Sequence, residues 1–319
     1  MKATAAAHAN IALVKYWGKR DDALVLPEAG SLSVALDRLL TTTTVELGAA
    51  EDSLRIDGRD ASPAELRRAR TVLDAAGIRK RARIESRNDF PTAAGLASSA
   101  SAFAALAVAA CAAAGQKRTS RDLSALARLG SGSASRSVPG GWAVWEDDAA
   151  EQVAAPDHLP VRFVVAVCGE SRKSVSSRDG MRSSRETSPF HRAWIEQCKR
   201  DLPEALRLLR ARDLAGLGAL AERNALRMHA DALAADPPLL YWEPATVACL
   251  RTVQRLRQGG KRAWATIDAG PHVVAMCAPD DASAVEAALR GTAGVRDALA
   301  CAPAQGARIV EQVRDARRG

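Results

Sequence analysis

The chain has 319 residues, of which 47% are hydrophobic and only 4% are aromatic, so it can bury one large core or two lobes that are packed mainly by small side chains. Its net charge of +8 favours anionic partners, but the scattered arginines accompany no zinc-finger, homeodomain or RNA-binding signature. The six cysteines form no CxxC pair and no apolar run could span a bilayer, which argues against zinc and membrane insertion and predicts a cytoplasmic protein with reduced thiols.

Strands and helices alternate along the chain, which predicts a mixed α/β fold. A helix is expected over 63–77, because a proline lies in its first turn and a glycine follows its end. The other elements expected in the first half are strands at 9–16, 41–47, 54–57 (as the hairpin partner of 41–47), 81–86 and 161–168, and helices at 97–114 and 120–129.

The second half is richer in amphipathic helices. Helices are expected at 192–211, 213–228, 245–258 and 281–291, and two strands are expected at 263–268 and 272–278. The polar stretch between them and the first half predicts an N-terminal lobe of residues 1–180 and a C-terminal lobe of residues 181–319.

Two loops contain the residue types that bind anions. In the loop 91–100, a glycine turn leads into a helix that opens with Ser98 and Ser99, where free backbone N–H groups could bind phosphate. The loop lacks the Gly-Lys-Ser/Thr of a Walker A motif, and the two serines could instead only cap a core helix. The loop 131–137 gathers small residues and hydroxyls around Arg136, whose guanidinium could grip a carboxylate or phosphate, although its composition would also suit a flexible surface loop.

Two strand ends carry further candidates. Tyr16, Trp17, Gly18 and Lys19 follow the first strand and could wall a pocket with one positive charge, or could simply end a strand. Asp268 follows a buried strand near the C-terminus, where it is a candidate general base or part of an Asx turn. The arginines at 67–70 and 79–83 are interpreted as a solvated helix face and its exit.

Together these loops resemble the GHMP kinase superfamily and, within it, the mevalonate diphosphate decarboxylases. The matching segments occur in the family's order and are ANIALVKYWGK at 9–19, PTAAGLASSA at 91–100, SGSASR at 131–136, VSSRDGM at 175–181 and IDAGP at 267–271. The sequence departs from the family's pattern at Ala29 and Gly30, at Ser135 and at His272.

The resemblance implies an α/β (α+β), two-lobed GHMP kinase-like fold with the active site in the cleft between the lobes, and a homodimer that uses ATP and Mg²⁺. It implies that mevalonate 5-diphosphate is decarboxylated to isopentenyl diphosphate, with phosphomevalonate decarboxylase and mevalonate 3-kinase activities as alternatives. A nucleic-acid-binding protein is the alternative from another class. The implied substrate-binding residues are Asn10, Tyr16, Trp17, Gly18, Lys19, Ser131, Gly132, Ser133, Ala134, Ser135, Arg136, Ser177 and Arg178. The implied ATP-binding residues are Pro91, Ala94, Gly95, Leu96, Ser98 and Ser99, with Ser99 also near Mg²⁺.

For the chemistry we expect three catalytic residues. Asp268 is predicted to accept the proton of the substrate's tertiary hydroxyl as this attacks the γ-phosphate. Lys19 is predicted to neutralise nearby negative charge and to keep that carboxylate ionised. Arg136 is predicted to orient the substrate carboxylate, which leaves as carbon dioxide once the new phosphate departs.

Overall fold

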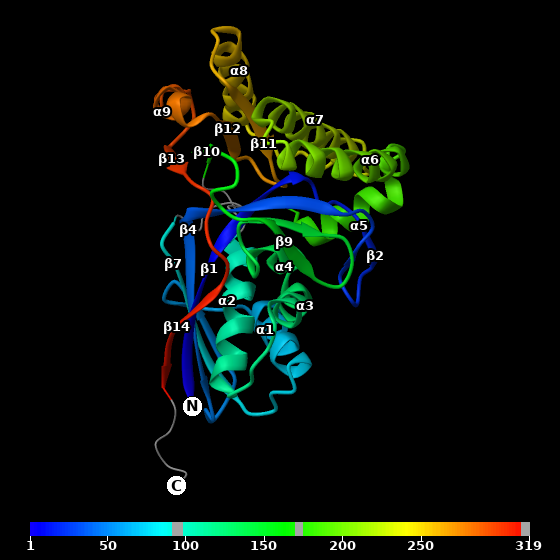
Figure 1. The fold of residues 1–319 in the computed structure, drawn as a ribbon. Helices are drawn as coiled ribbons and strands as arrows, with labels where there is room; N and C mark the ends of the chain where they lie inside the picture. The colour runs from blue at the N-terminus through cyan, green and yellow to red at the C-terminus, as the bar shows by residue number, and fades with distance from the viewer. Residues whose placement is uncertain (91–97, 170–174, 314–319) are drawn as a thin grey trace.

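The two long strands β1 (Lys2–Val14) and β4 (Ser31–Leu47) form the centre of the larger sheet (Figure 1). The structure is a computed structural model that describes residues 1–90, 98–169 and 175–313. The other strands of this sheet are β5 (Ser53–Ile56), β6 (Arg59–Asp60), β7 (Ala82–Asn88), β8 (Trp142–Trp145), β9 (Ala150–Ala154) and β14 (Arg308–Val313). The strand order is β14-β1-β4-β7-β5-β6, while β8 and β9 branch from β4.

The predicted hairpin between β4 and β5 is wrong. β7 occupies that edge of β4, from Thr41 to Leu47, and β5 pairs with β7 in parallel. A parallel pair needs a crossover, and helix α1 (Pro63–Ala75) supplies it. The predicted boundaries of this helix are confirmed: Ser62 and Glu65 form a capping box at its start, and Gly77 follows its end with a φ of 76°.

A second, four-stranded sheet has the order β11-β12-β10-β13. Its strands are β10 (Arg162–Val167), β11 (Ala263–Ile267), β12 (Val273–Cys277) and β13 (Asp297–Cys301), and a short hairpin of β2 (Lys19–Asp21) and β3 (Leu26–Pro27) lies apart from both sheets. Sheet membership therefore does not follow the predicted division at residue 180, because β10 precedes that residue and β14 follows it. Residue 180 itself lies inside helix α5 (Ser177–Thr187).

Helices cover both sheets and confirm the mixed α/β class. The remaining α-helices are α2 (Ser98–Ala113), α3 (Ser120–Gly130), α4 (Ala134–Ser137), α6 (His191–Arg210), α7 (Leu214–Leu233), α8 (Pro244–Gln258) and α9 (Ala282–Arg290). A short 3-10 helix, η2 (Pro279–Asp281), directly precedes α9. α1 to α4 pack on the larger sheet, whereas α7 contacts both β1 and β11 and so joins the two halves (Figure 1). Among the described residues, no helix has the combined length and hydrophobicity needed to cross a bilayer.

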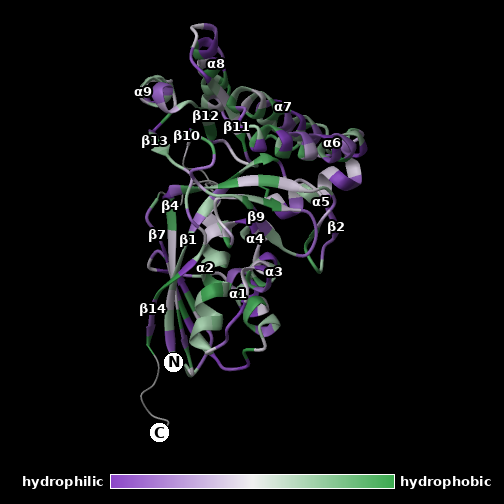
Figure 2. Cartoon of the chain, viewed as in Figure 1, coloured by the Kyte–Doolittle hydropathy of each residue, from purple (hydrophilic) through white to green (hydrophobic). Residues whose placement is uncertain are grey.

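The abundance of alanine explains how α2 packs. Nine of the sixteen residues of α2 are alanine and thirteen of the sixteen are buried. The helix is coloured as largely hydrophobic in Figure 2, whereas α6 shows hydrophilic patches. Small side chains let α2 contact β1 and β4 on one side and α1 and α3 on the other. The expectation that small residues do much of the packing is confirmed here.

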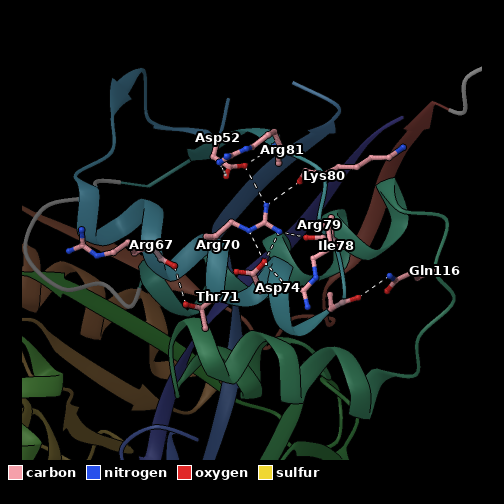
Figure 3. A network of polar contacts seen from close by, with 12 residues as sticks. Asp52, Arg67, Arg70, Thr71, Asp74, Ile78, Arg79, Lys80, Arg81 and Gln116 are labelled. Atoms are coloured by element: carbon pink, nitrogen blue, oxygen red, sulfur yellow. Dashed lines mark hydrogen bonds and ion pairs between the residues drawn. The ribbon is translucent and has the colours of Figure 1, made fainter. Parts of the chain in front are cut away.

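Arg70 fixes α1 to the strands beside it (Figure 3). Its guanidinium lies 2.9 Å from Asp74 and 3.4 Å from Asp52, and it also donates to the carbonyl oxygens of Lys80, at 3.1 Å, and Ile78. One side chain thus joins the helix, the turn after it and the loop before β5.

Replacing Arg70 with alanine should therefore lower the free energy of unfolding by about 1–3 kcal/mol, because these acceptors lose a charged donor. Arg67→Ala is the matched control. Its exposed side chain is one turn away on the same helix, so we expect a change within about 0.5 kcal/mol. Urea unfolding of the two variants measures the difference, and equal midpoints would contradict the assigned role.

Candidate active site

A cavity of about 580 Å³ opens where the end of β1, the loop after α3, the start of α5 and the turn after β11 meet. Asp268 and Lys19 both line it, as predicted. The other predicted residues that line it are Asn10, Tyr16, Trp17, Ser98, Ser99, Ser131, Gly132, Ser133, Arg136, Ser177 and Arg178. The lining also contains residues that were not predicted, namely Ala12, Lys15, Val25, Arg68, Ser176, Met181, Met228 and Ala269.

Three predicted substrate-binding residues do not line this cavity. Ser135 turns inward and donates to the carbonyl oxygen of Gly132 at 2.8 Å, and Ala134 is buried beside it. Gly18 has a φ of 140° and lies against Glu28 and the ring of His191. Pro91, Ala94, Gly95 and Leu96 lie outside the described residues. The family departures at Ala29, Gly30, Ser135 and His272 are likewise absent from the lining.

Asp268 forms its ion pair with Lys15 and not with Lys19, the lysine that was predicted to keep this carboxylate ionised. Lys15 Nζ lies 2.6 Å from Asp268 Oδ1 and donates to the carbonyl oxygen of Ala12 at 2.7 Å. Lys19 lies beyond the turn at Gly18, on β2, and its Nζ contacts Asp22 Oδ1 at 2.7 Å. The motif YWGK at 16–19 favoured its last residue, Lys19, as the charged partner. The lysine that contacts Asp268 is Lys15, which directly precedes the motif.

The electrostatic setting of Lys15 is unusual for a lysine. Its side chain is 1% exposed, while that of Asp268 is 31% exposed and faces the cavity. Burial lowers the pKa of Lys15, the nearby Asp268 carboxylate opposes that shift, and Arg136 adds to it. The result is one buried ammonium held against one partly solvated carboxylate.

Arg136 lies in a buried polar setting formed by β1 and β4. Its Nε donates to Asn10 Oδ1 at 3.3 Å and its Nη1 to Ser31 Oγ at 3.0 Å, while Asn10 Nδ2 donates to Ser137 Oγ at 2.8 Å. Burial lowers the pKa of Arg136 to about 10. No carboxylate within the described ranges forms an ion pair with it, so a buried cation is available to an anionic ligand.

The glycine and serine segment after α3 is not a flexible surface loop. Residues 134–137 form helix α4, whose side chains are all buried, and Ser124 Oγ of α3 donates to the carbonyl oxygen of Ser135 at 2.9 Å. The composition also suits a flexible surface loop, but the packing of α4 against α2 and α3 fixes the segment.

Gly132 leaves room for Tyr16. A Cβ atom at position 132 would lie 2.8 Å from both Cε1 and Oη of the Tyr16 ring, and the Tyr16 hydroxyl is buried without a partner among the described residues. Burial also raises the pKa of this hydroxyl well above its ordinary value, so it stays a neutral donor.

The variant Gly132→Ala should therefore push Tyr16 into the cavity and raise the KM for a substrate that occupies this cavity by about 10-fold, the equivalent of about 1.4 kcal/mol. Gly291→Ala is the control, because its nearest neighbour would be a carbonyl oxygen at 3.4 Å and its φ is ordinary. Steady-state kinetics of both variants decide the matter, and an unchanged KM in Gly132→Ala would show that Tyr16 does not border the ligand.

Arg68 joins this cavity to a second one of about 700 Å³. The second cavity shares Arg68, Ser98 and Ser99 with the first and has a more apolar wall that includes Phe103. Arg68 Nη2 donates to the carbonyl oxygen of Gly130 at 2.6 Å, and its guanidinium lies 4.7 Å from the Phe103 ring centre. The interpretation of residues 67–70 as a solvated face is wrong for Arg68, whose pKa is lowered to about 10 by burial and by the nearby Arg178.

The first cavity is built for anions. Its lining contains five cationic side chains, Lys15, Lys19, Arg68, Arg136 and Arg178, against the single carboxylate of Asp268. The described residues contain no group of three or more side chains that could hold a metal ion by themselves. A divalent cation here would have to arrive with a polyphosphate, with hydroxyls such as that of Ser99 as the protein's contribution.

Two family models match the chain in succession. The diphosphomevalonate decarboxylase-like N-terminal domain matches residues 7–155, and the mevalonate 5-diphosphate decarboxylase C-terminal domain matches residues 163–314. Among curated relatives, the diphosphomevalonate decarboxylase of Ganoderma lucidum is 37% identical over 86% of this chain and 77% of its own length. That of Homo sapiens is 34% identical over 90% of this chain and 79% of its own length.

Solved structures give the same result. The mevalonate diphosphate decarboxylase of Staphylococcus aureus is 37% identical and covers 97% of this chain and 98% of its own, with a TM-score of 0.91. A structure described as MDDEF in complex with MVAPP, AMPPCP and magnesium is 35% identical over 98% of this chain and 99% of its own, also with a TM-score of 0.91. The expected GHMP kinase-like fold is thereby confirmed, and the chain belongs to the diphosphomevalonate decarboxylase family of the GHMP kinase superfamily.

Proposed function

We propose that this chain catalyses the ATP-dependent decarboxylation of (R)-5-diphosphomevalonate to isopentenyl diphosphate, with carbon dioxide, ADP and phosphate as the other products, in the mevalonate pathway of isoprenoid biosynthesis. The proposal is supported by the family membership and by one structural observation above all. A lone carboxylate, Asp268, is held by a buried lysine in a cavity whose other charged side chains are all cationic. That arrangement suits a substrate with a carboxylate, a diphosphate and one proton to be removed.

ATP fits the pair of connected cavities. The apolar wall around Phe103 suits a planar base, and the shared residues Arg68, Ser98 and Ser99 would meet the phosphates at the junction. When bound with ATP, Mg²⁺ would neutralise part of the phosphate charge, and Ser99 is the described hydroxyl that we assign to it. The relative solved with MVAPP, AMPPCP and magnesium supports the same pair of ligands for this chain.

Asp268 acts as the proton acceptor in this proposal. A tertiary alcohol is a poor leaving group, so its oxygen must first be phosphorylated, and the hydroxyl proton passes to the Asp268 carboxylate as the oxygen attacks the γ-phosphate. The buried Lys15 ammonium holds that carboxylate in place at 2.6 Å. Lys19, paired with Asp22 at 2.7 Å, is assigned to the substrate's phosphate charge and not to the base.

Arg136 and the serine loop complete the pocket. Arg136 has no ion-pair partner in the described part of the chain and would orient the substrate carboxylate, while Ser131, Ser133 and Arg178 would hold the diphosphate. When the new phosphate leaves, positive charge develops at the tertiary carbon. The carbon–carboxylate bond then breaks, its electron pair forms the alkene, and carbon dioxide departs.

The experiment is to supply ATP, Mg²⁺ and one of three substrates: mevalonate 5-diphosphate, the monophosphate, or mevalonate. We expect equal amounts of carbon dioxide and ADP with the diphosphate and at most slow release with the other two. ADP without carbon dioxide would identify a 3-kinase, and preferential release from the monophosphate would identify a phosphomevalonate decarboxylase. Sedimentation of the purified chain tests the predicted homodimer.

A further inference from the structure

Asn224 of α7 contacts the backbone of Lys15, whose side chain forms the ion pair with Asp268. The ladder between β1 and β4 ends at Val14, so the next backbone N–H, that of Lys15, has no ladder acceptor. It donates instead to Asn224 Oδ1 at 2.8 Å, and Asn224 is fully buried. A side-chain amide thus takes the place of a strand partner at the residue whose ammonium meets the proposed base.

Asp201 of α6 determines which end of the Asn224 amide faces Lys15. A carboxylate can only accept hydrogen bonds, so it selects the NH₂ end of the amide, and Asn224 Nδ2 donates to Asp201 Oδ2 at 2.8 Å. The amide oxygen is thereby left for the N–H of Lys15. With the amide turned round, an oxygen would face the carboxylate and an NH₂ group would face an N–H group, and both contacts would be repulsive.

Asp201 is itself fixed from the other side. Gln197 Nε2 donates to Asp201 Oδ1 at 2.7 Å, and Arg227 Nη1 lies 3.1 Å from Asp201 Oδ2. Arg227 is 42% exposed, whereas Asp201 is buried. A continuous series of polar contacts therefore runs from the surface of α7 to the backbone of Lys15.

We infer that Asn224, oriented by Asp201, is a positioning residue for the Lys15–Asp268 pair, an inference that rests on the proposed function. Neither residue lines the cavity, so neither contacts a ligand there. Lys15 is held at its backbone by Asn224 and at its ammonium by Asp268 and the carbonyl of Ala12. Without the backbone contact, the end of β1 can shift, and small displacements of reacting groups cost much in rate.

The first test is Asn224→Leu, which keeps the volume of the side chain and removes its hydrogen bonds. We expect kcat to fall about 10- to 100-fold, while the KM values for both substrates stay within about twofold. The groups that face Lys15 are Asp268, Arg136 and His229. Because Asp268 is the one that raises the pKa of Lys15, a looser pair should also move the alkaline limb of the pH–rate profile to lower pH.

A charge swap makes the second test. Asn224→Asp alone places two carboxylates face to face and should reduce kcat about as much as Asn224→Leu. Adding Asp201→Asn restores a donor opposite the new carboxylate, which still accepts from the N–H of Lys15. We expect the double variant to recover most of the lost kcat. Failure to recover, with the fold intact, would overturn the assigned geometry.

Leu220→Ala is the matched control for general loosening of α7. Leu220 is buried on the same helix and contacts the core, not Lys15. It should lower thermal stability and leave kcat and the pH profile close to those of the native chain. A kcat loss in Leu220→Ala equal to that in Asn224→Leu, or a native kcat in Asn224→Leu, would overturn the positioning role. A native chain that releases no carbon dioxide would instead refute the proposed function.

Discussion

Replacing Asp268 with asparagine should reduce turnover by about 10²–10⁴-fold while ATP still binds, because the amide has nearly the same shape but cannot take up the proton of the tertiary hydroxyl. Among the described residues, the buried Lys15 ammonium would then have no counter-charge within hydrogen-bond distance, and it would keep the neutral carbonyl oxygen of Ala12 as an acceptor. Removing the partner of a buried charge in this way destabilises the native state, so the free energy of unfolding should fall as well.

Three measurements separate these effects for Asp268→Asn. Coupled ADP release gives kcat, calorimetry with ATP and Mg²⁺ gives nucleotide affinity, and urea unfolding gives stability. Asp157→Asn serves as the control, because Asp157 is an exposed carboxylate in a loop away from the cavity and its loss should leave all three unchanged. A variant at position 268 that kept near-native turnover would remove the proton acceptor from the proposed mechanism.

Lys15→Met should lower kcat by about 10²–10³-fold, whereas Lys19→Met should act mainly on the KM of the phosphorylated substrate. The two side chains differ in surroundings: Lys15 contacts Asp268, and Lys19 contacts Asp22 on the β2–β3 hairpin. The paired variants therefore test directly which lysine of the segment 15–19 supports the base.

The pH dependence follows from burial. The pKa of Lys15 lies below the ordinary lysine value, so its charge is lost at a lower pH than that of a surface lysine. Native activity should therefore fall on the alkaline side as Lys15 deprotonates, and this limb should be missing from the residual activity of Lys15→Met. Equal losses of kcat in the two lysine variants, or an alkaline limb that persists without Lys15, would contradict the assignment.

Local signals in the sequence predicted most helices and several strands well. α1 is bounded by Pro63 and Gly77, and α2 ends before Gly115, so their predicted limits agree with the structure to within a few residues. Asp268 was found because it follows a short apolar strand. These features depend on neighbours in sequence, and a single sequence displays them.

The errors concern contacts between distant segments. The partner of β5 could not be read from the sequence, because pairing with β7 depends on the crossover through α1. Arg68 resembles its exposed neighbours in sequence, and only the approach of Phe103 and Gly130 shows that it is partly buried between two cavities. Nothing local in the sequence distinguishes Lys15 from Lys19 as the partner of Asp268. The role of Lys15 depends on Asp268, 253 residues away.

The pairing of β14 with β1 has a consequence for biosynthesis. β1 leaves the ribosome well before β14, yet Lys2 to Ala6 receive their outer partners only from residues 308–313. Until β14 has been synthesised, the backbone N–H and C=O groups on one edge of this alanine-rich strand therefore remain without their strand partner. Pairing β1 with β14 also closes a loop of most of the chain, which is slow. Nascent chains lacking β14 should be the ones that most need a chaperone.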